Sequence, residues 1–490
     1  MQALILLLIP LGIAAWTFLL REEKIQGKVH FTGALVTLFW GGFLVKNVFQ
    51  SGPYWALGES IYVDSLSALI ITVIIIVNFA VSLFIPDYLR EEKNNGLITK
   101  KQTRLFYLLV NIFVTTMLSV VVVNNLGLMW VAIEATTLAS ALLVGFYDHK
   151  YSLEAAWKYI LLCTVGITFG LLGTVFTYYS AMSVLGHAGD ALHWTKLVSI
   201  APILDPSIIK IAFIFILVGY GTKMGLAPMH NWLPDAHSQA PTPVSALLSA
   251  VLLNCALYGI IRFYTISKIT LDNTFSNQLL IIFGLISLGI AVPFILLQED
   301  VKRLLAYSSV EHMGIIALGL GIGTKLAIFG AVLHLFNHAM AKSLFFMAVG
   351  SISQHFKTRE IPKIHGIAKV MPKTVVFLLV GAFAVTGLPP FSIFLSEFTI
   401  GRATFQAGHY LVGTLYLIFI ALIFAGLGFH IVNMAFGPGP KELVIKNENP
   451  VMLTAMAIPL VFVVGLGFSL PDFVIEIIEQ VVAVIGKGIA

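Results

Sequence analysis

The chain has 490 residues, of which 58% are hydrophobic and only 11% are charged, with a formal net charge of +5. Its mean hydropathy is +0.94. The surface of a soluble globular protein needs about a quarter charged residues, so the composition excludes that class and predicts a polytopic membrane protein. The cations are scattered between apolar runs and form no basic patch, so the positive balance indicates membrane topology and no nucleic-acid partner.

Apolar runs of about 18 or more residues, the length that crosses a bilayer, divide the whole chain. The first run has no basic segment before it and no small-residue cleavage site, so we expect a membrane span there and not a signal peptide. The fold class expected is an all-α integral membrane protein with about fourteen transmembrane helices. The predicted spans are 2–20, 28–49, 61–86, 104–123, 126–146, 155–179, 208–237, 241–265, 276–297, 303–323, 326–350, 373–405, 411–435 and 450–470.

Lys and Arg residues gather in the odd-numbered connections between these spans, while the even-numbered connections are nearly bare. By the positive-inside rule, the odd connections are cytoplasmic and both termini lie outside. The apolar tail after Pro471 has sparse charges, which suits an interfacial helix or one that docks on a neighbour. The cations that carry the orientation are Arg21, Lys24, Lys28, Arg90, Lys93, Lys100, Lys101, Arg104, Lys357, Arg359, Lys363, Lys369 and Lys373.

The seventh span, 208–237, is predicted to be a helix broken inside the membrane. Its apolar run reaches Lys223 in mid-membrane and is then interrupted by Gly225, Pro228 and Pro234. Freed backbone groups at that depth are tolerated only inside protein or beside a wet cavity, and an intramembrane Lys indicates an ion path. The alternative is a Lys that snorkels from a helix end, with prolines that serve packing alone.

The twelfth span repeats this break. Gly-Leu-Ala-Pro at 225–228 is followed by Asp235, and Gly-Leu-Pro-Pro at 387–390 is followed at the same offset by Glu397. Because the two spans are five apart, the chain passes through them in opposite directions, which predicts two inverted five-helix repeats, each with a broken helix. The expected units are 1–103 (spans one to three), 104–265 (with the break in 208–237), 266–435 (with the break in 373–405) and 436–490 (last span and amphipathic tail).

Ionisable residues inside the spans are the candidates for function. Glu134 lies in the middle of the fifth span with no charge within ten residues on either side. We interpret it as a proton site whose charge Lys223 stabilises; the alternative is a protonated carboxyl that only locks two helices together. Glu397 is either a second carboxylate of the path or an interfacial acid near a helix end.

The eleventh span carries His334, His338 and Lys342 at intervals of four, which places them on one helical stripe. Imidazoles titrate near neutral pH, so this stripe favours a proton relay. A His pair at this spacing also suits a metal. However, no carboxylate or Cys accompanies the pair and the third member is a Lys, so we expect no metal site.

Two charged clusters border spans, and we expect both near a membrane face. In the cluster at the start of the tenth span, Glu311 and His312 are relay candidates, while Asp300, Lys302 and Arg303 are mainly structural. His230, Asp235 and His237, after the first break, are secondary relay candidates with a mainly structural role. Neither cysteine, Cys163 nor Cys255, has CxxC spacing, so we expect no redox centre, no cofactor and no catalytic residue.

Three long motifs resemble one known family. TKMGLAPMHNWLPDAHSQAPTPVSALLS, LLAYSSVEHMG and HLFNHAMAKSLFFMAVGSI are similar to the antiporter-like proton-translocating subunits of respiratory complex I (NADH dehydrogenase), Mrp-type Na+/H+ antiporters and energy-converting hydrogenases. The resemblance covers roughly 60–435. It implies a non-catalytic subunit, without a cofactor, that moves H+ or Na+ beside other membrane subunits of a redox-driven complex in a prokaryotic cytoplasmic membrane. The alternatives are an Mrp-type antiporter subunit and a non-conducting scaffold.

The resemblance assigns the family's ionisable positions to Glu134 in the fifth span, Lys223 in the seventh and Glu397 in the twelfth. The relay positions of the eleventh span are His334, His338 and Lys342. One position departs from the complex I pattern: Asn254 in the eighth span, where a Lys or His is common. An amide cannot hold a proton at neutral pH, so water must bridge this point or the first half conducts differently. This departure favours the hydrogenase-4 component F branch.

Overall fold

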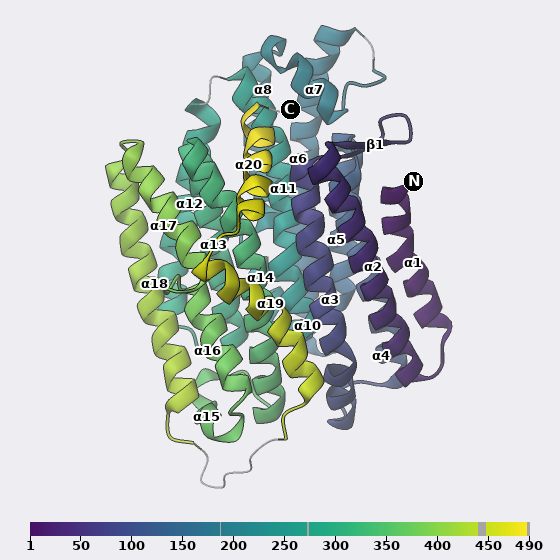
Figure 1. Ribbon diagram of the computed structural model, residues 1–490, viewed down its shortest axis with the longest axis vertical. Helices are drawn as coiled ribbons and strands as arrows, with labels where there is room; N and C mark the ends of the chain where they lie inside the picture. Colours follow the sequence, from purple (N-terminus) through teal and green to yellow (C-terminus); the bar gives the residue numbers. More distant parts are fainter. Residues whose placement is uncertain (187, 272–273, 440–446, 488–490) are drawn as a thin grey trace.

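The computed structural model describes residues 1–186, 188–271, 274–439 and 447–487; the rest of the predicted C-terminal unit, 440–446 and 488–490, lies outside the described residues. The described chain is helical apart from a short antiparallel hairpin of strands β1 (Tyr54–Ala56) and β2 (Ile61–Val63). Long helices lie side by side, with α1 and α2 at one edge of the bundle and α18 at the other (Figure 1). The fold class predicted from the sequence is thereby confirmed.

The helices follow the predicted spans closely. They are α1 (Gln2–Leu19), α2 (Glu23–Ser51), α3 (Ser65–Asn94), α4 (Lys100–Val122), α5 (Leu126–Val144), α6 (Lys150–Leu185), α7 (Trp194–Ile200), α8 (Pro206–Met224), α9 (Trp232–Gln239), α10 (Thr242–Leu247), α11 (Leu253–Thr270), α12 (Thr274–Leu296), α13 (Val301–Ile322), α14 (Lys325–Phe356), α15 (Ile367–Val370), α16 (Thr374–Val385), α17 (Ser392–Gln406), α18 (Tyr410–Phe436), α19 (Pro450–Phe468) and α20 (Asp472–Lys487). Short 3₁₀ turns, η1 (Ala201–Ile203) and η3 (Ile361–Lys363), and a π-helix, η2 (Leu248–Leu252), complete the described elements.

Thirteen helical stretches among the described residues are long and apolar enough to cross a membrane. The one further predicted span, the twelfth (373–405), is divided into α16 and α17, each too short to cross alone. Helix α8 is likewise followed by the short α9, and α10, η2 and α11 form one continuous span. The total agrees with the sequence, which counted each broken helix as one span.

The centre of the bundle is formed by helices without a lipid-facing side. The most apolar window of the α10–α11 span and that of α13 are both 100% buried, and the window of α14 is 94% buried. The corresponding figure is 28% for both α1 and α18, at the two edges. Because charged side chains in lipid are costly, the interior helices are the ones able to carry them.

Each broken helix turns at a glycine in the left-handed region, Gly225 with φ +82° and Gly387 with φ +66°. A side chain on either residue would be strained in this conformation. Polar groups near the two breaks are bonded within the protein: Ala227 N donates to Ser287 Oγ at 3.0 Å, and Asn337 Nδ2 donates to Ser392 O at 2.8 Å. The breaks therefore exist at membrane depth because neighbouring helices satisfy their backbone.

The C-terminal helix α20 packs on its own bundle. It lies against α3, α11 and α14, and buries Ile478, Val481 and Ile485. Gln480 and Ser65 are joined by a hydrogen bond of 3.3 Å. The apolar face that suggested an interfacial or neighbour-docking helix is thus covered within the chain.

The connections after α3 and after α14, both rich in Lys and Arg, meet at one end of the bundle. Gln354 Nε2 donates to Tyr88 O at 3.2 Å and to Glu92 Oε1 at 2.7 Å, which ties the end of α14 to the end of α3. We call this the cation-rich end.

Candidate functional site

Lys223 lies on the last turn of α8 and is fully buried. Its ammonium donates to Thr137 Oγ1 at 2.9 Å and to Tyr159 OH at 2.5 Å, and lies 4.6 Å from the centre of the Tyr159 ring. Trp232, the first residue of α9, places its ring 5.9 Å from the same ammonium. The amine therefore points into the bundle and does not snorkel to a surface.

Glu134 does not pair with Lys223 directly. Its carboxylate accepts from Thr137 Oγ1 at 3.2 Å and from Thr164 Oγ1, on α6, at 2.8 Å. Thr137 accepts from the lysine and donates to the glutamate, so one hydroxyl joins the two charges. Glu134 is also only half-buried in the isolated chain, at the face formed by α5 and α6, whereas its position in an apolar span suggested full burial.

Asn254 lies on the first turn of α11, directly after the π-helix η2. It is fully buried, and its Nδ2 donates to Ala250 O at 2.8 Å. Its Oδ1 makes no hydrogen bond to the described residues. In the π-helix, Ser249 Oγ bonds Ser309 Oγ of α13 at 2.8 Å, which links the two halves of the molecule. Local π geometry often accompanies function, and periodicity in the sequence does not reveal it.

The polar stripe of α14 faces α13. Lys342 donates to Leu305 O at 3.0 Å and to Ser308 Oγ, both on α13. His338 is buried, and its ring centre lies 5.2 Å from that of His312. Neither ring nitrogen of His338 bonds a described residue. The stripe predicted from four-residue spacing thus lies in the interior.

Glu311 and His312 belong to this same interior cluster. The sequence placed them near a membrane face, which is wrong: both are buried on a helix whose apolar window is fully enclosed. They stand ten and eleven residues after Val301, so they lie about 15 Å along α13 at 1.5 Å per residue. The charges at the start of the tenth span misled the prediction because they are close in sequence but not in depth.

A chain of hydrogen bonds joins three helices in this cluster. His312 Nδ1 bonds His334 Nε2 at 2.9 Å, and His334 Nδ1 bonds Ser396 Oγ of α17 at 3.0 Å. Ser396 donates its own proton to Ile393 O at 2.8 Å. The serine must then accept from His334 Nδ1, so Nε2 of a neutral His334 accepts from His312.

Glu397 completes the cluster from α17. It is 6% exposed and brings a carboxylate oxygen within 4.8 Å of a ring nitrogen of His312 and of His334. A Cβ at Gly387 would overlap this carboxylate, so the second helix break makes room for it. The alternative of an interfacial acid does not fit this position. The sequence argument against a metal, that no carboxylate accompanies the histidines, does not hold in the folded chain.

The residues after the first break divide into interior and surface positions. His237 is fully buried, with Nδ1 2.9 Å from Leu233 O. His230 is buried against the edge of Tyr307. Asp235 lies at the surface, where it forms ion pairs with Arg303 and, at 3.3 Å, with Lys158. We therefore assign Asp235 a structural role.

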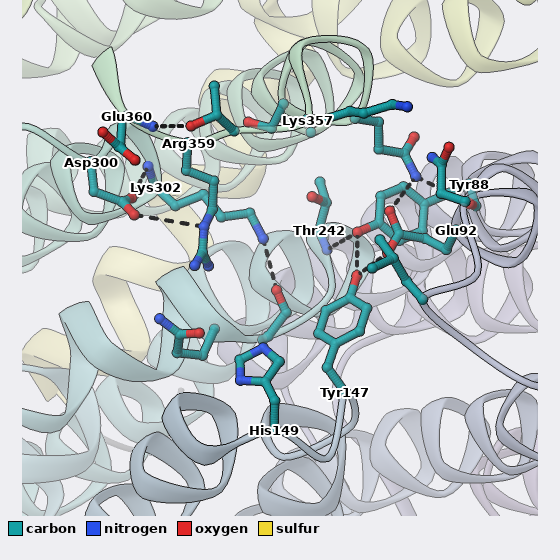
Figure 2. A pocket seen from close by; sticks show the side chains of 18 of the residues that line it. Tyr88, Glu92, Tyr147, His149, Thr242, Asp300, Lys302, Lys357, Arg359 and Glu360 are labelled. Carbon is teal, nitrogen blue, oxygen red and sulfur yellow. Dashed lines mark hydrogen bonds and ion pairs between the residues drawn. The ribbon is translucent and has the colours of Figure 1, made fainter. Parts of the chain in front are cut away.

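A cavity of about 730 Å³ opens at the cation-rich end (Figure 2). Lys302 lines one side and is 4% exposed, with Nζ donating to Ala240 O at 2.7 Å. Glu92 lines the opposite side and accepts from Tyr147 OH at 2.6 Å. Burial raises the pKa of Tyr147 well above its ordinary value, so this phenol stays protonated and remains a donor. The charge pattern in the sequence indicated a structural role for Lys302 and did not single out Glu92.

A buried ion pair lies near the opposite end of the bundle. Arg262 of α11 donates to both carboxylate oxygens of Asp64, the N-cap of α3, at 2.6 and 2.7 Å. Its guanidinium carbon lies 4.1 Å from the Trp194 ring centre and 4.7 Å from that of Tyr258. No local pattern in the sequence indicates this pair, because its members are far apart along the chain.

These features define a multi-pass, all-helical membrane protein with two broken helices and buried Lys, His and Glu side chains along its centre. The chain belongs to the NADH:quinone oxidoreductase/Mrp antiporter transmembrane family, whose match covers residues 123–424. It is 40% identical over 380 residues to a hydrogenase-4 component F homolog from Methylacidiphilum infernorum, covering 78% of this chain and 80% of the relative. The family resemblance drawn from the three motifs is confirmed.

Solved structures share the fold. A chain of an archaeal membrane-bound sulfane sulfur reductase superposes with a TM-score of 0.86 at 24% identity, covering 100% of this chain and 99% of the other. A chain of the Mrp complex from Dietzia sp. DQ12-45-1b gives a TM-score of 0.85 at 18% identity, covering 99% and 97%. Both chains are parts of larger complexes.

Proposed function

We propose that this chain is a proton-translocating membrane subunit of a redox-driven complex of the membrane-bound hydrogenase type. The observation that carries the proposal is the row of ionisable and hydroxyl side chains enclosed by the central helices. Charges and titratable groups in a membrane interior are costly, and they occur there mainly where ions move. The row begins at Glu134 and Lys223 and ends at His334 and Glu397.

The row has two parts and one link. In the first part, Thr137 joins Glu134 to Lys223. In the second part, Lys342 bonds α13 and is followed by His338, His312 and His334. The link is α11, which carries Cys255 within electrostatic reach of Lys223 and is continuous with η2, whose Ser249 bonds Ser309. Asn254 stands beside Cys255 and has a free carbonyl oxygen, so it is suited to hold a bridging water.

The side chains favour H+ over Na+ as the ion. A sodium ion, like other hard cations, prefers oxygen ligands, as Ca²⁺ and Mg²⁺ do. The central row offers imidazoles and amines, which bind protons and repel a bare cation when charged. Among the described residues, Glu397 brings a carboxylate oxygen within 4.8 Å of a ring nitrogen of His312 and of His334. A Na+/H+ antiporter subunit therefore remains the second candidate.

Partner subunits are expected at the face formed by α5 and α6. Glu134 is half-buried there, surrounded by exposed apolar side chains such as Leu138, Leu142 and Val165. A carboxylate facing lipid would be costly, whereas a neighbouring subunit of the complex would enclose it. We place the chain in the cytoplasmic membrane of a prokaryote, with the cation-rich end inside.

The test is proton uptake by the assembled complex reconstituted in liposomes, driven by its own redox reaction and followed with a pH-sensitive dye. Exchange of Lys342 for Met should lower proton uptake per turnover while the complex remains assembled. The matched exchange of Lys325, which is exposed on the same helix, should leave it unchanged. Equal uptake in all three proteins would favour the scaffold alternative, and uptake of ²²Na+ in place of H+ would favour the antiporter.

A further inference from the structure

We propose that His312, His334 and Glu397 form a buried site for a divalent cation of the Zn²⁺ class. Each residue offers one donor atom, and the three atoms lie within 4.8 Å of one another. They come from α13, α14 and α17, which no sequence spacing would bring together. Two imidazoles and one carboxylate are a donor set that proteins use for zinc, with a fourth position left for water.

The distance between the two imidazoles is already close to that of a zinc site. Donor atoms around tetrahedral zinc lie about 3.4 Å apart, given metal–ligand bonds of about 2.0–2.2 Å. His312 Nδ1 and His334 Nε2 are already 2.9 Å apart. Glu397 has an Oε1 that is buried and makes no hydrogen bond to the described residues, so this oxygen is available.

The second shell is already arranged for one ligand. A metal-binding histidine usually donates its other ring N–H to a fixed acceptor, which sets its tautomer. His334 Nδ1 lies 3.0 Å from Ser396 Oγ, and Ser396 is itself fixed by its bond to Ile393 O at 2.8 Å. His334 Nε2 therefore presents its lone pair to His312 and, in the proposed site, to the metal. His312 Nδ1 would give up the proton that it now donates, and a neutral His312 would carry its proton on Nε2, which bonds no described residue.

The charged groups around the site include side chains of both signs. Lys342 lies within electrostatic reach of His312 and opposes a cation. Glu311 lies within electrostatic reach of both Lys342 and Glu397, and its carboxylate favours a bound cation. The site as a whole therefore holds two carboxylates against one amine, which suits a divalent ion bound with modest affinity.

The consequence rests on the proposed function. The same two imidazoles and the same carboxylate cannot hold a metal ion and pass a proton at once. Bound Zn²⁺ would break the bond between His312 and His334 and stop proton transfer at the end of the row. Zinc would then inhibit translocation from within the membrane.

Binding is measured first, because it does not depend on transport. The full chain, purified in detergent and freed of metal with a chelator, is equilibrated for hours with Co²⁺, since the site is buried. We expect one Co²⁺ per chain with the visible absorption of tetrahedral coordination, displaced by Zn²⁺. The exchanges H312Q and E397Q should each weaken Zn²⁺ binding more than about a hundredfold, beyond the roughly 10–100-fold cost of losing a second-shell partner.

Matched controls use residues outside the cluster, H430Q on α18 and E476Q on α20, which should bind Zn²⁺ as the unchanged chain does. Equal affinity in H312Q and E397Q, or loss of binding in a control, would overturn the site. Two separate ligand exchanges keep the test decisive if one variant fails to fold. Zinc is then added to the reconstituted complex: normal proton uptake with Zn²⁺ bound would overturn the blocking role, whereas absence of uptake without zinc would contradict the proposed function itself.

Discussion

Thr137 stands between the two charges of the first half. Its single hydroxyl accepts from Lys223 and donates to Glu134, so a proton that leaves the lysine has a bonded path of two steps to the carboxylate. A direct ion pair would hold both charges fixed, because separating opposite charges in a low dielectric is expensive. The bridged arrangement lowers that cost.

Single exchanges at Asn254 test whether this amide holds a bridging water on the proton path. The amide is fully buried, and its Oδ1 is free to hold a water. We expect Asn254→Leu, which has a similar volume, to reduce proton uptake per turnover while assembly persists. Asn254→Lys should retain more activity because its amine can join the relay. Uptake is measured with the reconstituted complex, and normal uptake by the leucine variant would remove the eighth span from the path.

The two helix breaks position the side chains of the candidate site. Each break ends a helix at membrane depth and allows the following helix to begin at a new angle, with its backbone satisfied by neighbouring helices. At the first break, Trp232 Nε1 donates to Thr222 O at 2.7 Å, which fixes the start of α9 beside Lys223. At the second break, the glycine turn leaves space for the Glu397 carboxylate. The breaks therefore act by positioning side chains.

Gly387→Ala tests this role. A Cβ would overlap the Glu397 carboxylate, and a non-glycine residue at φ +66° costs about 1–2 kcal/mol. We expect a lower unfolding temperature and a marked loss of proton uptake. The control Gly428→Ala lies within α18, where a Cβ meets nothing within 4 Å, and should leave both unchanged. Normal uptake by Gly387→Ala would show that the carboxylate tolerates displacement.

The ion pair between Asp64 and Arg262 is an element-scale anchor that joins α3 to α11. Arg262→Ala leaves a buried carboxylate without its partner, which costs about 3–5 kcal/mol. We expect a large fall in thermal stability in detergent. The control Arg90→Ala removes an ion pair with Asp87 whose arginine side chain is 61% exposed, and should change stability by about 1 kcal/mol or less. Similar effects of the two exchanges would contradict the anchoring role.

For the molecule as a whole, the sequence predicts those features whose signal is local. It does not predict those that depend on how the helices pack. Apolar run length gave the spans, and Gly and Pro gave both breaks, because these act within one helix. Spacing on a single helix gave the stripe of His334, His338 and Lys342. The approach of Glu397 to His312 was not predictable, since it joins α17 to α13 through tertiary packing alone. The burial of Lys302 was not predictable, because a position near a span end says nothing about which way the side chain points.

Orientation in the membrane is a prediction for the whole molecule. The connections 88–104 and 351–373, which meet at the cation-rich end, should face the cytoplasm. Single cysteines at Asn94 and Thr358, in a chain whose own two cysteines are buried, are labelled with a membrane-impermeant maleimide. We expect labelling in inside-out vesicles. Labelling of intact cells at either position would reverse the assigned topology.

The most direct measurement is the number of protons moved per redox turnover by the assembled complex with Lys223 unchanged, replaced by Ala or replaced by Arg. If protons pass through this chain, Lys223→Ala should lower that number, because the amine bonded to Thr137 is lost while redox chemistry continues elsewhere. Lys223→Arg should fail to restore it, since a guanidinium keeps its proton. An unchanged ratio of protons to turnovers in the alanine variant would contradict the account.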